Sequence, residues 1–320
     1  MVNSIKIRPF FRFLYYILNR SLLVRLEQQY KGNKESELAY PPIFILGPPR
    51  CGSTLIFQTV DASFDFGVFT NLHCAFHGAP YLAEYITKRI RPKIIRNFQS
   101  NFGNVKGIFG VSECGSWWYR FFSNEPSSHS MASATPENIY ALKHSLSKWM
   151  NVTNSSVVFK NLFITLRLRA IAKYLPESIF IVIKREEIDI GHSLLEARYK
   201  INGSYAKWWS VEPPGADKIK CLPPYEQVIE QIRLIYKTIE AELELGGVAT
   251  NQRIDINYED FCANPEGSIN QIESFLRANG VKIVRKKGKL PSNFKKRSKI
   301  RIDPIMYDRM VNYVNDTKTR

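Results

Sequence analysis

A short turn between a predicted strand and a predicted helix contains two glycines, an arginine and two hydroxyl side chains. An apolar run that ends at Leu46 is typical of a buried strand, and a helical pattern begins at Ser53 or Thr54. Between them lie Gly47, Arg50 and Gly52. The order strand, glycine turn, helix directs backbone N–H groups and the positive end of a helix towards an anion, usually a phosphate. The sequence therefore predicts an anion-binding loop.

The loop differs from a nucleotide-hydrolysing loop at one position that matters chemically. From Gly47 to Thr54 the spacing almost matches G-x-x-x-x-G-K-[S/T], the pattern of loops that bind ATP or GTP. Ser53 stands where that pattern has its lysine, so the usual clamp on the β- and γ-phosphates is missing. Arg50 is the nearest cation, and it can neutralise charge on a bridging or leaving oxygen of a different anhydride. The alternative is a glycine turn that only links a strand to a helix.

These residues resemble the loop of the sulfotransferases that use 3′-phosphoadenosine 5′-phosphosulfate (PAPS), which reads roughly G-x-P-R-S-G-T-T. The matching positions are Gly47, Pro49, Arg50, Gly52 and Thr54, whereas Cys51 and Ser53 depart from the usual residues. The resemblance implies that PAPS is the co-substrate, that no metal is required, and that Arg50 steadies the leaving phosphate. The loop residues implied to contact PAPS are Arg50, Cys51, Gly52, Ser53 and Thr54.

A second anion-binding motif is predicted where a later strand ends and a helix begins. Arg185, Asp189 and Ser193 match in register the R-D-P-R-D-x-x-x-S motif with which the same family binds the 3′-phosphate. An arginine at a strand end can make a bidentate contact to a dianionic phosphate, and a serine two turns into the helix can add a hydrogen bond. The resemblance therefore implies that Arg185 and Ser193 bind the co-substrate. Glu186 and Glu187 depart from the motif, and their charges must point away from a bound phosphate.

A general base is predicted from a carboxylate beside a run of aromatic residues. Glu113 precedes a cluster formed by Trp117, Trp118, Tyr119, Phe121 and Phe122. A carboxylate near apolar rings can act as a base, whereas the alternative is a capping glutamate in front of core aromatics. Many carbohydrate sulfotransferases use a glutamate or a histidine in this part of the chain, so the resemblance favours Glu113, with His77 or His73 in reserve. A loop histidine is otherwise an ordinary surface or hydrogen-bonded residue.

The most basic part of the chain lies between residues 281 and 301. Many sulfotransferases close a late basic loop over the 3′-phosphate, so the resemblance implies a co-substrate contact from this region. The residues assigned to that contact are Arg285, Lys286 and Lys287. The alternatives are a solvated surface and a nucleic-acid patch. Because no helix-turn-helix, zinc-finger or RNA-stacking motif accompanies the charge, we expect no nucleic-acid partner.

The composition fits a globular protein with an anionic partner. The 320 residues are 44% hydrophobic and carry a formal net charge of +16. Such a charge favours a nucleic acid, an acidic membrane, a charged polysaccharide or a multiply charged nucleotide as partner. The five cysteines are scattered and lack C-x-x-C spacing, so neither a zinc site nor a disulfide framework is indicated. We therefore predict a reducing compartment, the cytoplasm.

Residues 1–39 are predicted to form a basic amphipathic helix and a polar linker, and residues 40–320 a single domain. Arginines interrupt every apolar run near the N-terminus, so none is long enough to span a bilayer. No signal-peptide cleavage pattern follows. The helix can lie on an anionic membrane or pack on the protein's own core, and we favour the second interpretation.

The motifs are carried by apolar strands that alternate with helices. Strands are predicted over 42–46, 66–70, 157–161 and 179–185, and a fifth begins at 253. One helix is predicted directly after the first strand, and others over 81–96, 162–174, 224–245 and 267–277. Two apolar strands joined by one helix require a right-handed parallel crossover. The sequence thus predicts an α/β protein, and the resemblance, which runs from about 42 to 276, implies a P-loop-like three-layer fold with a central parallel sheet flanked by helices. The region of resemblance includes Tyr258-Glu-Asp-Phe261, to which we assign no chemistry.

The predicted function is the transfer of a sulfuryl group from PAPS to an acceptor hydroxyl. Aromatic and basic residues, including Trp208 and Trp209 in a loop-like segment, favour a saccharide or glycolipid, and a tyrosyl or small-molecule hydroxyl stays open. One alternative is a P-loop-type nucleotide or small-molecule kinase, against which the absent lysine argues. Another is a non-enzymatic polyanion-binding protein, whose affinity would collapse with salt for any polyanion. The sequence does not predict the oligomeric state.

Overall fold

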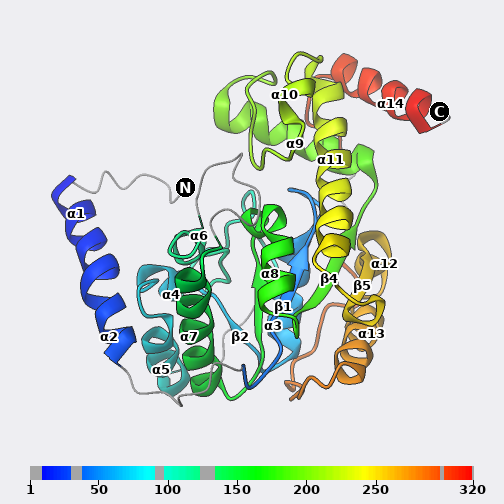
Figure 1. Ribbon diagram of the computed structural model, residues 1–320. Coiled ribbons are helices and arrows are strands. Elements are labelled where there is room, and N and C mark those ends of the chain that lie inside the picture. The colour runs from blue at the N-terminus through cyan, green and yellow to red at the C-terminus, as the bar shows by residue number, and fades with distance from the viewer. Residues whose placement is uncertain (1–8, 30–37, 91–96, 123–133, 296–298, 319–320) are drawn as a thin grey trace.

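The computed structural model describes residues 9–29, 38–90, 97–122, 134–295 and 299–318 (Figure 1). Its centre is a sheet of five parallel strands in the order β2-β3-β1-β4-β5. The strands are β1 (Ile43–Leu46), β2 (Gly67–Val68), β3 (Val157–Lys160), β4 (Ile179–Lys184) and β5 (Arg253–Asn257). The first strand therefore lies between β3 and β4, and the segments that follow these three strands leave the sheet at one edge.

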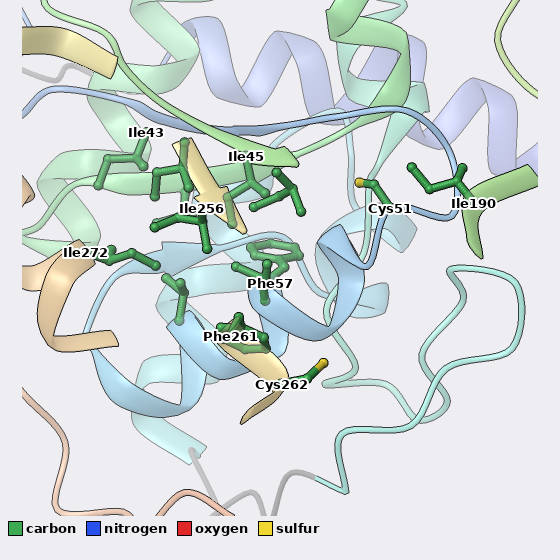
Figure 2. Close-up of a cluster of buried hydrophobic side chains, with 14 of the residues drawn as sticks. Ile43, Ile45, Cys51, Phe57, Ile190, Ile256, Phe261, Cys262 and Ile272 are labelled. Carbon is green, nitrogen blue, oxygen red and sulfur yellow. The ribbon is translucent and has the colours of Figure 1, made fainter. Parts of the chain in front are cut away.

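Strand β1 buries side chains on both faces, as expected of a central parallel strand. Because successive side chains of a strand point to opposite faces, Ile43 and Ile45 enter one hydrophobic cluster and Phe44 and Leu46 enter another. Figure 2 shows the first cluster, in which the two isoleucines share the core with Phe57 of the following helix. The sheet thus separates two cores.

Helices cover both faces of the sheet. One face carries α3 (Ser53–Ser63), α12 (Tyr258–Ala263) and α13 (Pro265–Ala278), and the other carries α6 (Gly115–Trp118), α7 (Pro136–Thr153) and α8 (Leu168–Tyr174). Beyond the carboxyl end of β4, α9 (Glu187–Asn202), α11 (Pro224–Leu245) and α14 (Pro304–Lys318) pack together, near the short α10 (Ala216–Ile219) (Figure 1). The predicted three-layer α/β fold with a central parallel sheet is confirmed.

One predicted helix is divided in two. In place of a continuous helix over 162–174 there is a 3-10 turn, η3 (Leu162–Leu166), followed by α8. Asn161 accepts a hydrogen bond from the backbone N–H of Phe163 at 2.7 Å, which fixes the start of the turn. The chain then breaks at Arg167, where φ is −130°. The β-branched Ile164 and Thr165 have restricted χ1 rotamers, which weakens the preference for an unbroken helix.

The N-terminal segment consists of α1 (Pro9–Ile17), the π-helical stretch η1 (Leu18–Leu23) and α2 (Val24–Gln29). It packs on the protein next to α4 (Asn71–Ala75) and α5 (Pro80–Ile90) (Figure 1). The segment thus contacts the rest of the protein, while Phe13, Leu14 and Tyr16 of α1 stay exposed and lie outside the core. In the described part of the chain, none of the helices combines the length and the apolar character needed to cross a bilayer.

Candidate functional site

Polar residues of the predicted motifs gather at the carboxyl end of four neighbouring strands. Lys160 ends β3, Arg50 lies in the loop after β1, Arg185 follows β4 and Tyr258 follows β5. In open parallel sheets, ligands bind in the crevice outside this edge. Residues far apart in the sequence are therefore neighbours because their strands are paired.

The loop after β1 has a backbone conformation that few residues accept. Gly52 has φ +96°, and a Cβ atom added to it would lie 2.0 Å from Cε2 of Tyr258. Arg50 has φ +72°, in the left-handed region that is uncommon for residues other than glycine. Strained residues of this kind cluster at ligand-binding and catalytic sites. Gly52 is also the N-cap of α3 and supplies no side-chain cap, so the positive end of the helix is presented to the crevice.

The side chain of Cys51 supports the loop from the core. It is fully buried, and Figure 2 shows it at one end of the hydrophobic cluster, near Ile190 of α9. Burial raises the pKa of the Cys51 thiol, and Ser53 lies within hydrogen-bond distance of it. A thiol that is neutral and enclosed leaves any anion contact at this position to the backbone.

The structure brings the two predicted anion-binding motifs into direct contact. Arg185 Nη1 donates a hydrogen bond to the backbone carbonyl of Arg50 at 2.9 Å. Arg50 Nε in turn donates to Ser193 Oγ, also at 2.9 Å. Both motifs therefore lie side by side, as a single ligand with two anionic groups requires.

Arg185 is positioned to receive an anion. Its guanidinium lies over the ring of Tyr258, with Cζ 4.4 Å from the ring centroid, and burial raises the pKa of Tyr258. Asp189, one helical turn later, approaches Arg185 Nη2 at 3.7 Å, which is too long for a hydrogen bond. The Nε atom of Arg185 is buried and has no acceptor among the described atoms. The side chain is 17% exposed overall, and an anion would contact its exposed part.

One of the two glutamates that depart from the family motif points away from the crevice. Glu187 forms a bidentate ion pair with Arg233 of α11, with both of its carboxylate oxygens 2.9–3.2 Å from guanidinium nitrogens. Its charge is therefore neutralised by the neighbouring helix and does not oppose an anion at Arg185.

Glu113 lies at the same edge of the sheet, beyond β3. Its carboxylate forms an ion pair with Lys160, the last residue of β3, and its backbone carbonyl accepts a hydrogen bond from Asn161 at 2.7 Å. A Cβ atom added to Gly103 would lie 3.8 Å from Thr54 Oγ1 and 3.9 Å from Glu113 Oε1. Thr54 of α3 and the carboxylate of Glu113 therefore both lie close to Gly103. The Glu113 side chain is 33% exposed and can be reached by a solute.

Four of the five aromatic residues after Glu113 belong to the core. Trp117, Trp118, Phe121 and Phe122 are buried in the second hydrophobic cluster together with Phe159 of β3. The fifth, Tyr119, is 37% exposed and meets Phe163 edge to face at 4.7 Å. The charged partner of Glu113 is Lys160. Aromatic rings near the loop come from elsewhere: Arg50 lies over Phe102 at 5.1 Å, and Phe102 meets Trp209 edge to face at 6.3 Å.

His73 and His77, the two alternative candidates for the base, are held by contacts within the fold. His73 is 1% exposed and lies between Thr70 Oγ1, at 2.8 Å, and Glu84, at 3.0 Å. His77 lies under α1, where its Nδ1 is 3.2 Å from the hydroxyl of Tyr15, and burial lowers its pKa. The described hydrogen bonds of His77 are with Tyr15, Cys74 and Arg120 and not with the loop. Among the residues that the structure describes, no cluster of His, Cys, Asp and Glu has the arrangement of a metal site.

The late basic residues lie at the wrong end of α3 to contact an anion at the loop. Arg285 forms a β-bridge with Phe64, the residue that ends α3, and Lys286 Nζ donates to the carbonyl of Asp61 at 2.8 Å. The helix has 11 residues, so about 16 Å separates this end from the loop. Arg285 is paired with Glu266 and Glu273 on α13, and Lys287 is exposed to solvent. The expected co-substrate contact of Arg285, Lys286 and Lys287 does not fit this position.

Three residues of the site were not assigned a role from the sequence, namely Lys160, Tyr258 and Phe102. The first two immediately end or follow a strand, and that position is the signal by which they could have been selected. Phe102 lies in an irregular loop, and nothing in its local pattern marks it.

The fit of Gly52 under the Tyr258 ring gives a stability prediction. We expect Gly52→Ala to lower the free energy of unfolding by about 3 kcal/mol, because left-handed strain adds to a clash with a packed ring. The matched control is Gly107→Ala, where φ is +88° and nothing lies within 4 Å of an added Cβ; there about 1 kcal/mol is expected. Urea unfolding measures both, and equal losses would contradict the close packing of Tyr258 on the loop.

Comparison with known proteins agrees with the geometry. A family model described as "Sulfotransferase family" matches residues 41–279. Among solved structures, sulfotransferase STF9 from Mycobacterium avium is 15% identical with a TM-score of 0.53, over 98% of this chain and 79% of that one. Sulfotransferase STF1 from Mycobacterium tuberculosis is 14% identical with a TM-score of 0.50, over 86% of this chain and 77% of that one. These two likenesses show a shared fold, and no curated protein sequence matches the chain.

Proposed function

The chain belongs to the sulfotransferase family, and we propose that it transfers a sulfuryl group from PAPS to a hydroxyl of a saccharide or glycolipid. The family match confirms the predicted enzyme class. The observation that carries the choice of donor is the contact between the two anion-binding motifs, Arg185 to the carbonyl of Arg50 and Arg50 to Ser193.

The proposed donor has phosphate groups on both the 3′ and the 5′ oxygen of its ribose, and each motif is proposed to bind one of them. Arg50 and the uncapped N-terminus of α3 are proposed to bind the 5′-phosphosulfate, since both supply positive charge at the loop. Arg185 and Ser193 are proposed to bind the 3′-phosphate, because both contact Arg50 of the loop and Arg185 is a partly exposed cation beside it. The backbone of Cys51, Gly52, Ser53 and Thr54 completes the 5′ side.

The proposed chemical step is an in-line displacement at sulfur. The acceptor oxygen forms a bond to sulfur while the bond from sulfur to the bridging phosphate oxygen breaks, and the hydroxyl proton moves to the carboxylate of Glu113. The negative charge that develops on the departing phosphate is stabilised by Arg50 and the helix end. The products are a sulfate ester and 3′-phosphoadenosine 5′-phosphate. Side chains and the helix end supply the compensating charge in this proposal.

A saccharide or glycolipid acceptor is supported by the rings beside the loop. Phe102 and Trp209 meet edge to face close to Arg50, and Lys200 Nζ lies 5.9 Å from the Phe102 ring centroid. Aromatic faces suit the apolar sides of sugar rings, and a lysine suits an acidic substituent. The ring of Trp208 is less available to an acceptor, because Arg198 Cζ lies 5.2 Å from its centroid. The proposed location is the cytoplasm, which agrees with five cysteines that are all unpaired.

Calorimetry with the purified full chain tests the donor. We expect 3′-phosphoadenosine 5′-phosphate to bind at least about tenfold more tightly than AMP, ADP or ATP, because the 3′-phosphate adds charge-assisted hydrogen bonds. Equal affinity for all four nucleotides would contradict PAPS as the donor. A kinase would instead prefer ATP, and a general polyanion-binding protein would show affinities that all fall together with salt.

The same measurement tests Arg185 directly. We expect Arg185→Ala to weaken binding of 3′-phosphoadenosine 5′-phosphate by roughly 10- to 100-fold, the equivalent of losing charge-assisted hydrogen bonds. The affinity for AMP, which has no 3′-phosphate, is expected to change little. The control is Lys286→Ala, a cation at the far end of α3, which we expect to bind both nucleotides as the unmodified chain does. Equal losses for the two nucleotides in Arg185→Ala would contradict a 3′-specific contact.

A further inference from the structure

The N-terminal segment α1-η1-α2 presents its apolar side chains outwards. Seven large apolar or aromatic residues in it are each at least 40% exposed. One of them, Tyr15, turns its hydroxyl inwards to the carbonyl of Cys74, and the other six are Phe13, Leu14, Tyr16, Ile17, Leu22 and Leu26. Tyr85 of α5, 48% exposed, follows by one turn Tyr81, whose hydroxyl contacts the carbonyl of Leu26. So many exposed apolar side chains on one short segment are typical of an interaction site.

The inward side of the same segment is held by polar groups. Asn19 is fully buried, accepts a hydrogen bond from the N–H of Gly78 at 2.9 Å and donates to the carbonyl of Ala75 at 3.0 Å. Glu27 is 2% exposed, pairs with Arg120 and accepts from Ser145 at 2.7 Å. Buried polar networks fix one geometry. The outward apolar face is therefore held in place by specific bonds and is not left over from a loosely docked helix.

The charge of the segment is of one sign. The first 26 residues contain no Asp or Glu, and their basic residues are Lys6, Arg8, Arg12, Arg20 and Arg25. Arg20 and Arg25 are exposed, and Arg20 lies 5.6 Å from the ring centroid of Tyr16. The first acidic residue, Glu27, is buried and paired. Arginines interleaved with exposed aromatic and aliphatic residues are characteristic of helices that lie in the interface of an anionic bilayer.

We propose that α1, η1 and α2 bind the surface of an anionic lipid bilayer, with the six outward apolar side chains inserted and Arg20 and Arg25 at the headgroups. A bilayer supplies both an apolar layer and negative charge, which this surface requires together. A second copy of the chain supplies the apolar surface but brings the same arginines and a net charge of +16, so like charges would oppose it. The proposal is independent of the proposed sulfuryl transfer.

Flotation of the full chain with lipid vesicles tests the proposal. We expect binding to vesicles of 70% phosphatidylcholine and 30% phosphatidylglycerol at low salt, and at least about tenfold weaker binding to phosphatidylcholine alone. Arg20→Gln/Arg25→Gln should reduce binding to the anionic vesicles by roughly 30-fold, about fivefold for each charge. Tyr16→Ser/Leu22→Ser/Leu26→Ser should reduce it by at least roughly 50-fold, because three inserted side chains are lost.

A triple variant outside the segment controls for nonspecific lipid binding by exposed apolar residues. Leu245, Val284 and Ile305 are each more than 55% exposed and lie outside the segment, so their replacement by serine should leave vesicle binding unchanged. Calorimetry with 3′-phosphoadenosine 5′-phosphate or a thermal melt verifies that each variant is folded. No flotation of the unmodified chain, or equal flotation of the two triple variants, would overturn the proposal. So would a stable dimer in sedimentation that Tyr16→Ser/Leu22→Ser/Leu26→Ser alone dissociates, since the surface would then join two copies.

Discussion

Glu113→Gln is expected to reduce kcat by roughly 10²- to 10⁴-fold, the usual contribution of a positioned general base. The amide keeps the size of the side chain but cannot take the proton of the acceptor hydroxyl. Because the described hydrogen bonds and ion pair of Glu113 are with Lys160, Asn161 and Leu162 and not with Arg50 or Arg185, the affinity for 3′-phosphoadenosine 5′-phosphate should stay within about threefold. Turnover with a radiolabelled sulfate donor and calorimetry with the product nucleotide measure the two quantities separately.

A second carboxylate serves as the control for Glu113. Glu273 on α13 is also paired with cations, Arg277 and Arg285, each at 2.7 Å, and it lies away from the crevice. Glu273→Gln should keep full turnover. If Glu113→Gln also keeps full turnover, the assignment of the base is wrong. The donor site is tested separately, by the nucleotide affinities. If both variants lose activity, loss of an ion pair and not of a base is the cause.

Arg50→Ala is expected to reduce kcat by about 10²- to 10³-fold, as the removal of one preorganised charge-stabilising group does. The side chain is the cation within the loop, and its backbone already adopts φ +72°, so alanine adds little new strain. The carbonyl of residue 50 remains to accept the bond from Arg185, which keeps the 3′-phosphate site formed. Single-turnover rates measured at saturating donor isolate the chemical step from binding.

The charge and the geometry of Arg50 can be separated with a lysine. Arg50→Lys keeps a positive charge but loses the planar donors that reach Ser193, so we expect it to recover at least about tenfold over alanine without reaching the unmodified rate. A rate for Arg50→Ala within threefold of the unmodified chain would contradict stabilisation of the leaving phosphate by this residue.

The two predicted anion-binding motifs could be recognised in the sequence because each is local. Arg50 and Gly52 lie in one turn between a strand and a helix, and Arg185 and Ser193 lie at the start of another helix. An apolar strand followed by a breaker and a helical pattern indicates that the residues between them lie at the carboxyl end of the strand. Pairing of β1 with β4 then places the two motifs side by side, although their residues are 135 positions apart in the hydrogen bond between Arg185 and Arg50.

Contacts between segments could not be predicted in the same way. Nothing near Tyr258 in the sequence states that its ring covers Gly52, because that contact depends on β5 pairing with β4. The assignment of Arg285, Lys286 and Lys287 rests on their charge and on the family resemblance, and neither says which end of α3 the segment meets. The prediction for Glu113 rests on the rings that follow it and on the same resemblance, yet its charged partner is Lys160 on a strand reached 47 residues later.

The hydrogen bond from Arg50 to Ser193 has a consequence for how a nucleotide would be received. Without a ligand, the cation of the first motif is already bonded to the serine of the second. Ser193 Oγ accepts this bond, so its hydroxyl can still donate to a phosphate oxygen while the bond to Arg50 persists. In the proposed reaction, the contacts for the two phosphates of the donor are therefore set at a fixed spacing before the donor arrives. Such preorganisation reduces the ordering entropy that binding costs.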